Sequence, residues 1–178
     1  MANRWRGRRA GLAIVLALAT AAASASVLSA LGRGDTRTNS TLAVVVRDAH
    51  GVLLVRVPLP ATGLFALRYR NSLYGSFAEE RFVATPDRRF HLLELAADEL
   101  AVLEEYYAVP GPAEHAPAGD RRTWRARPAD TSAFERLTIA ATRLGERTLL
   151  VPGHEDVALW RLVDREPGVV MELEGTDR

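Results

Sequence analysis

Short runs of β-branched and alternating residues, separated by turn residues, dominate the chain after residue 41. Leu42–Val46 and Val52–Val57 are two such runs, and the residues between them, 48–51, have a turn composition. The runs at 64–72 and 78–84 alternate apolar with polar side chains, as half-buried strands do. Further strands are expected at 90–95, 134–142, 148–151 and 157–162. This pattern predicts a mainly β fold, an antiparallel sandwich or a small barrel.

One short helix is expected among these strands. Asp98 suits a helix N-cap, and apolar residues recur on one side from about Glu99 to Tyr107. A loop rich in proline, glycine and alanine follows, from Val109 to Asp120. The run at 134–142 has a helical alternative, but its threonine and isoleucine favour a strand. We expect a turn at Leu144-Gly145 to join it to the next strand as a hairpin.

The N-terminal segment has the layout of an export signal. Residues 10–32 carry no charge, and Arg4, Arg6, Arg8 and Arg9 stand just before them. The small residues at 21–25 suit cleavage of a signal peptide, whereas a helix over the uncharged run would extend about 34 Å and could span a bilayer. Residues 1–31 are therefore expected to form an N-terminal apolar helix, either a signal peptide or a membrane anchor, and the remaining chain is expected outside the cytoplasm.

The rest of the chain divides into three parts on composition. Residues 32–41 are small and polar and form a flexible tether, 42–163 form the β domain, and 164–178 form an acidic tail with one apolar patch at 169–171. All 23 basic residues of the chain are arginines, and four precede residue 25, so the exported part has 19 against 22 acidic residues. That balance argues against binding nucleic acid. Because the chain has no cysteine, the domain must rely on packing instead of disulfides.

A group of residues on the first alternating pair of strands resembles a known bacterial family. The string from Phe65 to Ser72, followed by Glu80 and Phe82, is similar to the family catalogued as domain of unknown function 1850. That family shows an aromatic residue, a strand ending in His-Ser, a glutamate nine residues after the histidine, and an aromatic two residues later. In this chain Asn71 stands where the family has the histidine, and Phe77 where it usually has a proline.

The resemblance covers about residues 42–162 and implies a cellular setting. Members of the family are small, exported or membrane-tethered, and often encoded beside permeases of the tripartite periplasmic (TRAP) transporter type. The resemblance thus implies a partner, a TRAP-type permease or its solute-binding protein, and assigns no reaction.

The candidate site is a polar group on the same hairpin. Asn71 and Glu80 belong to the apolar faces of consecutive strands, so we expect the two side chains to lie side by side. Ser72 stands at the strand end, where a serine usually bonds its own turn. The favoured interpretation is a structural bond that pins the loop between Ser72 and Phe77. Ligand binding and catalysis are the alternatives, and asparagine cannot transfer a proton near neutral pH.

Other polar and aromatic residues are less strongly indicated as parts of a binding or catalytic site. Tyr69, Tyr106, Tyr107 and Trp124 could line an apolar pocket or belong to the core. The four histidines are dispersed, so neither a base for Ser72 nor a metal site is expected, and no cofactor is implied. A solvated cross-strand ladder is expected from the remaining charges of the hairpin, which are Arg68, Arg70, Arg81 and Glu79.

These observations lead to one functional expectation and two alternatives. The expectation is a non-enzymatic extracytoplasmic β domain that assists a TRAP-type solute transporter or binds a partner at the membrane, which it reaches through its N-terminal segment. The alternatives are a secreted hydrolase that uses Ser72 or Glu80, and a purely structural domain of the cell envelope.

Overall fold

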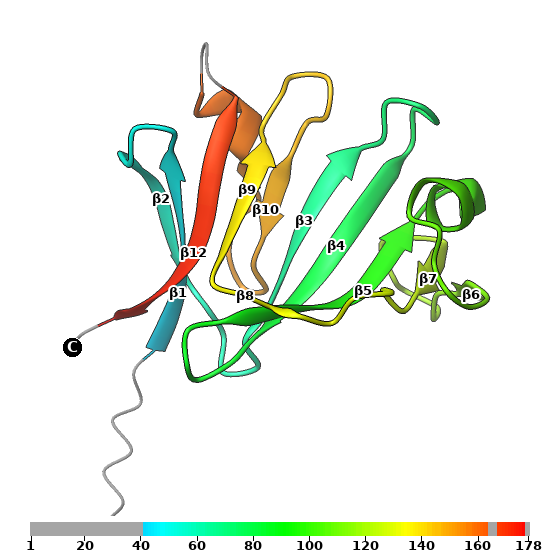
Figure 1. Cartoon of the computed structure of the whole chain (residues 1–178), viewed down its shortest axis with the longest axis horizontal. Coiled ribbons are helices and arrows are strands. Elements are labelled where there is room, and N and C mark those ends of the chain that lie inside the picture. Colours follow the sequence, from blue (N-terminus) through cyan, green and yellow to red (C-terminus); the bar gives the residue numbers. More distant parts are fainter. Residues whose placement is uncertain (1–40, 164–166, 177–178) are drawn as a thin grey trace, which may run out of the picture. The chain divides into compact units, whose positions relative to one another are not determined.

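A computed structural model of the protein describes residues 41–163 and 167–176, so the expected leader and nearly all of the tether lie outside the described residues. The described residues form two antiparallel sheets (Figure 1). The strand order is β2-β1-β12-β9 in one sheet and β11-β10-β3-β4-β5-β7-β6 in the other, with β8 beside β5. Because neither sheet closes on itself, the small barrel is wrong, while the mainly antiparallel β class is confirmed and a sandwich is consistent with it.

The four-stranded sheet is built around the first and the last strands. β1 (Thr41–Asp48) pairs with β2 (Leu53–Pro58), as the turn between the two β-branched runs predicts. On its other side β1 pairs along its whole length with β12 (Gly168–Thr176), which in turn pairs with β9 (Arg136–Ala140). The four side chains from Ala43 to Val46 are all fully buried, so both faces of β1 are covered.

The C-terminal segment is not a tail outside the domain. The expected boundary at residue 163 fails because β12 lies between β1 and β9 and its side chains enter the core. Val169 and Met171 are fully buried, and Glu172 and Glu174 bind Arg47 of β1. The acidic composition of the segment led to the prediction of a tail, but the segment is a strand whose glutamates form ion pairs with an arginine of the neighbouring strand.

The larger sheet is a meander with short strands added at both sides. β3 (Leu64–Arg70), β4 (Phe77–Ala84) and β5 (Phe90–Ala97) pair in sequence order, as the alternating runs predict. The added strands are β6 (Glu114–His115), β7 (Trp124–Ala126), β8 (Ala133–Phe134), β10 (Thr148–Leu150) and β11 (Val157–Ala158).

Three local predictions need correction. The strand expected at 134–142 divides into β8 and β9, which belong to different sheets. The hairpin expected through Leu144-Gly145 is wrong, because β9 pairs with β12 while β10 pairs with β3 and β11. The strand expected at 157–162 ends after two residues and continues as a 3₁₀ turn, η2 (Leu159–Arg161).

The expected helix is present as a single turn. It is η1 (Val102–Tyr106), with π-helical hydrogen bonding and no side-chain cap at its start. Val102 and Leu103 are fully buried on the side that faces the sheet. Within residues 41–163 and 167–176, no helix combines the length and the apolar composition needed to cross a bilayer.

Both sheets share one hydrophobic core. Val44 and Met171 of the four-stranded sheet belong to the same cluster as Phe65, Phe82 and Phe90 of the larger sheet. The three rings have centroids 5.2–5.5 Å apart, in stacked and edge-to-face geometry. Each buried phenylalanine contributes roughly 1.5–3 kcal/mol through removal of its surface from water. A second, smaller cluster lies where η1 covers the far ends of β3, β4 and β5.

Candidate functional site

Asn71 pins the loop after β3. Its side chain is 3% exposed, and its Oδ1 accepts hydrogen bonds from the backbone N–H groups of Leu73 at 3.0 Å and Tyr74 at 3.2 Å. Its backbone N–H donates to the carbonyl of Ser76, and its carbonyl accepts from the N–H of Gly75. An asparagine that satisfies its own turn in this way is structural. The loop is pinned as the favoured interpretation expects, but through its own backbone and not through a bond between Asn71 and Glu80.

Glu80 does not lie beside Asn71. In the ladder between β3 and β4 the residue opposite Glu80 is Leu67, four positions before Asn71, which corresponds to about 13 Å along a strand. The predicted side-by-side pair is therefore wrong, although both residues occupy the expected sheet face. Ser72 is exposed in the loop, and no hydrogen bond joins it to a histidine among the described residues.

Glu80 instead ends a chain of hydroxyl groups, which we term the tyrosine chain: Tyr69, Tyr107 and Glu80. The Tyr69 hydroxyl donates to the Tyr107 oxygen at 2.6 Å, and the Tyr107 hydroxyl donates to Oε1 of Glu80 at 2.8 Å. Arg147 donates to Oε2 of Glu80 at 3.4 Å and lies 4.8 Å from the Tyr69 ring centroid. Glu80 is thus satisfied on both oxygens by residues distant in sequence.

The environment of the tyrosine chain keeps both hydroxyl groups protonated. Burial raises the pKa of Tyr69 to about 12, and it raises the pKa of Tyr107 further, with the charge of Glu80 adding to the effect. Desolvation disfavours a phenolate, and a neighbouring carboxylate disfavours it again. At neutral pH these tyrosines are hydrogen-bond donors.

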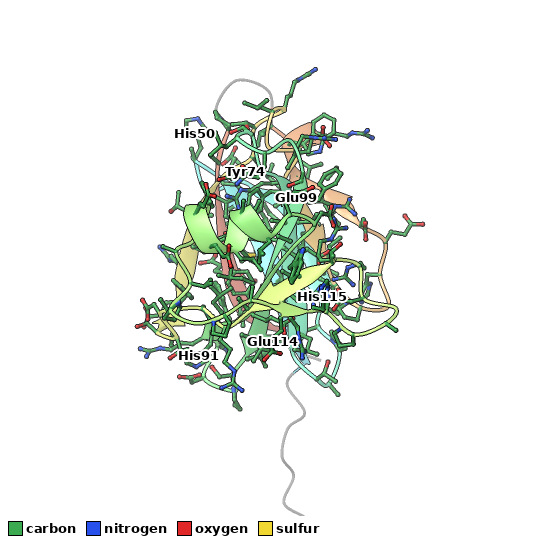
Figure 2. The ribbon with its side chains drawn as sticks, turned by 90° about the vertical axis from the view of Figure 1, so that its right-hand side faces the viewer. His50, Tyr74, His91, Glu99, Glu114 and His115 are labelled. Carbon is green, nitrogen blue, oxygen red and sulfur yellow. The ribbon has the colours of Figure 1, made fainter. Side chains whose placement is uncertain are left out.

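Three of the four aromatic residues expected to line a pocket or belong to the core lie at the smaller hydrophobic cluster: Tyr69 belongs to it, and Tyr107 and Trp124 pack against it. Tyr69 and Tyr107 lie together in the tyrosine chain, whereas Tyr106 is exposed and packs in edge-to-face geometry with the Tyr107 ring. Trp124 stacks on His115 with centroids 3.8 Å apart, on the short β6–β7 ribbon. Figure 2 shows His115 and Glu114 on that ribbon, below the coil of η1.

The opposite face of β3, β4 and β5 carries a network of charges, which we term the arginine–carboxylate network: Glu79, Arg81, Asp120, Arg121 and Arg122. Glu79 is 0% exposed and binds Arg121 at 2.8 Å, Arg81 at 3.1 Å and Arg122 at 3.3 Å. The solvated ladder expected at this face is therefore wrong. The loop before β7 folds over Glu79 and brings two arginines to it, which the sequence of the hairpin could not indicate.

The network fixes its carboxylates in the charged form. Arg81 donates to Asp120 at 2.5 Å and 2.8 Å, and this hydrogen bond lowers the pKa of Asp120 to about 2. Burial alone would raise the pKa of Glu79, but Arg121 and Arg81 outweigh it and hold the pKa below its ordinary value. Arg81 also donates to Glu94 of β5 at 2.8 Å. Such bidentate, charge-assisted bonds give the loop a defined position on the sheet.

A groove lies beside the network on the same face. It encloses about 550 Å³ between β3–β5, the loop at 119–121 and the loop at 151–156. Its polar lining includes Arg81, Asp120 and His154, and its apolar lining includes Leu64 and Leu93. A second hollow of about 620 Å³ begins on the other side of Leu93 and Glu94 and extends to Pro110–Pro112 and Arg125. Leu93 is 53% exposed between the two hollows.

The sequence held a partial signal for this groove. Glu79 and Arg81 alternate away from the apolar face, which places them on the groove side of β4. Asp120, Arg121 and Arg122 follow a proline- and glycine-rich loop, and nothing in their spacing shows which strand they reach. The residues that shape the groove were therefore not predicted.

The described residues show no arrangement that is typical of metal binding, since no three carboxylate, imidazole or thiol groups gather among them. In both polar arrangements, the charged and hydroxyl groups bind one another and so present dipoles and charges in fixed positions.

Comparisons with protein-family models, with curated proteins and with solved structures found no match to this chain. The resemblance drawn from the hairpin residues thus stays a prediction.

Proposed function

We propose that this chain is a non-enzymatic extracytoplasmic binding domain that works as an accessory component of a TRAP-type solute transporter. The export leader supports the location, and the resemblance of the β3–β4 hairpin residues supports the partner. The observation that carries a binding role is the groove beside the arginine–carboxylate network.

The groove has the properties of a recognition site. Its volume of about 550 Å³ lies within the range of small-molecule and peptide sites, about 300–1,000 Å³. Its wall at Arg81 and Asp120 is held by ion pairs, so it is formed before a partner arrives. Leu64 and Leu93 offer apolar surface next to these charges. Preorganisation of this kind reduces the entropy lost on binding.

The groups with perturbed pKa values in the two polar arrangements are unsuited to acid–base chemistry near neutral pH, which supports a binding role. A general acid or base works best when its pKa lies near the working pH. The pKa of Asp120 is about 2, and the pKa of Tyr69 is about 12. These groups keep one protonation state across the neutral range and act as fixed charges and donors.

Recovery of transporter components from membranes tests the proposal. The full chain with an affinity tag is expressed in its own host, and membranes are solubilised in detergent before purification. We expect mass spectrometry to identify a TRAP-type permease subunit or its solute-binding protein. Leu93→Arg, which places a charge in the groove, should reduce that recovery strongly.

Tyr106→Arg is the matched control, because Tyr106 is 56% exposed on η1 and outside the groove lining, against 53% for Leu93. It should leave the recovery unchanged. The proposal is wrong if no transporter component is recovered, and the role of the groove is wrong if both variants behave alike.

A further inference from the structure

Four connections of the described chain meet at one end of the molecule. Asp48 pairs with Val169, and Ala140 pairs with Gly168, so the β1–β2 turn and the loop after β9 lie together at the start of β12. Residues 159–163 follow β11, whose Ala158 pairs with Thr148 directly after the loop at 141–147. The backbone N–H of Arg70 donates to the carbonyl of Gly145 at 2.7 Å, which joins the loop after β3 to them. We term this end the loop end, comprising residues 49–53, 71–76, 141–147 and 159–163.

The figures agree with this placement. In Figure 1 the turns after β1, β3 and β9 all lie at the top, opposite the start of β1. Figure 2 shows His50 and Tyr74 at this end and His91 at the other.

The loop end concentrates exposed aliphatic side chains. Leu73 is 73% exposed and Leu144 is 68% exposed, and each stands within a different loop. Val52, Leu53 and Leu162 are exposed at the same end. Turns in water favour glycine, asparagine, aspartate and serine. Large aliphatic residues on several neighbouring turns mark a surface that contacts something less polar than water.

The charge at the loop end that is not already paired is positive. Arg143 is exposed, and Arg161 is exposed with its guanidinium 4.7 Å from the centroid of Trp160. Neither arginine has a carboxylate partner among the residues that the structure describes. Glu146, the carboxylate within the described residues of the loop end, binds Arg70 at 3.2 Å, and Asp48 at the end of β1 accepts from the N–H groups of its own turn.

We propose that the loop end rests on an anionic lipid surface. Aliphatic side chains on separate loops can enter the interfacial region individually, while arginines stay at the level of the lipid phosphates. Tryptophan is enriched at the same depth of a bilayer, which suits Trp160. This contact is separate from the N-terminal leader and from the groove, and it does not depend on a transporter partner.

Fluorescence quenching with the full chain tests this proposal. Because the chain has no cysteine, one label can be placed by Val52→Cys at the loop end, or by Asp87→Cys in the turn after β4 as the control position. The proteins are reconstituted into vesicles of phosphatidylglycerol and phosphatidylethanolamine, or of phosphatidylcholine, with a quencher in the acyl chains. The leader is common to all variants, so differences in quenching report the position of the domain.

We expect strong quenching at position 52 and weak quenching at 87 in the anionic vesicles, with a clear loss in phosphatidylcholine. Adding Leu73→Asp and Leu144→Asp should remove most of the quenching at 52, and Arg143→Gln with Arg161→Gln should remove its dependence on anionic lipid. Leu64→Asp with Leu93→Asp, two exposed leucines outside the loop end, should change neither. Unchanged thermal melting of all variants shows that they fold.

Two outcomes overturn the proposal. Equal quenching at positions 52 and 87 means that the domain has no preferred orientation on the lipid. Absence of quenching at 52 in every vesicle means that the loop end does not touch lipid, and a protein partner then becomes the explanation for its apolar residues. Neither outcome bears on the groove or on the recovery of transporter components.

Discussion

Glu79 shows how one buried residue organises a face of this protein. A fully buried carboxylate is costly unless cations and hydrogen bonds compensate it. Arg81 comes from the same strand, while Arg121 and Arg122 come from a loop more than forty residues later. The carboxylate thereby connects the sheet to the loop that forms one wall of the groove.

The substitution Glu79→Gln should destabilise the protein by about 2–4 kcal/mol, because it leaves three arginines without their shared counter-charge. Chemical denaturation monitored by circular dichroism measures this change. Glu114→Gln, at an exposed ion pair with Arg125, should stay within about 0.5 kcal/mol of the parent protein. Equal stability of the two variants would show that the network does not support the fold.

The tyrosine chain has a pH dependence of its own. The folded protein holds the phenolic protons of Tyr69 and Tyr107 more tightly than the unfolded chain does, since both pKa values are raised. This stabilisation is complete below the ordinary tyrosine pKa of 10.0 and is lost as the pH rises from there towards about 12, the pKa of Tyr69.

Tyr107→Phe should therefore lower stability at neutral pH by about 1 kcal/mol, through loss of the bonds to Tyr69 and Glu80. It should also flatten the decline of the melting temperature above pH 10.0. Tyr106→Phe, at an exposed ring, should keep the parent's alkaline profile. A profile that is identical in all three proteins would contradict the role given to burial.

At the scale of elements, β12 is the strand that completes the four-stranded sheet. It pairs with β1 over eight positions and with β9 over five. Its side chains alternate between core and surface, with Val169, Met171 and Leu173 buried. A strand from the end of the chain that pairs with the first strand makes the sheet depend on contacts between the two ends of the domain.

Met171→Ala should lower the free energy of unfolding by about 2–4 kcal/mol, because it leaves a cavity in the core that both sheets share. The neighbouring Val170→Ala, at a half-buried position on the other face, should cost less than about 1 kcal/mol. Urea denaturation distinguishes the two. Similar costs would mean that β12 is not held in the register described here.

Across the whole molecule, the large sheet carries a different polar arrangement on each face. The core side holds the tyrosine chain at the smaller hydrophobic cluster, to which Tyr69 belongs, and the outer side holds the arginine–carboxylate network and the groove. Both arrangements use a residue of β4, since Glu79 and Glu80 are adjacent and point to opposite faces. This strand thus contributes side chains both to the core and to the proposed binding surface.

Acid should weaken the whole fold through the network. Asp120 has a pKa of about 2 in the folded protein against an ordinary 3.8, so the stabilisation it contributes is present above about pH 4 and is lost as the pH falls towards 2. Glu79, whose pKa is also lowered, adds to the loss in the same direction.

Asp120→Asn should have a shallower decline of stability over this acid range than the parent protein, measured by urea denaturation at successive pH values. Glu155→Gln, at an exposed loop carboxylate, should keep the parent's slope. Matching slopes in the parent and Asp120→Asn would exclude Asp120 as the source of the acid sensitivity.

The local alternation of the sequence determined most of the strand positions. The runs before Pro58, from Leu64 and from Phe90 form strands as predicted, because period-two alternation and β-branched residues act over a few neighbours. The same reasoning placed Asn71 at the end of a strand, where it pins its loop.

Contacts between distant segments decided the rest. Arg121 binds Glu79, 42 residues away in the sequence, and Tyr107 binds Glu80, 27 residues away. No local pattern in the sequence indicates which residues such loops contact. The acidic segment after residue 163 forms an inner strand of the four-stranded sheet, because it pairs with the edge of β1, where apolar side chains and Arg47 contact it. The sequence by itself determined the positions of the strands with clear alternation or β-branched runs. Tertiary packing decided which strands pair, which charges are buried and where the groove lies, since those depend on free energies shared between residues far apart in the chain.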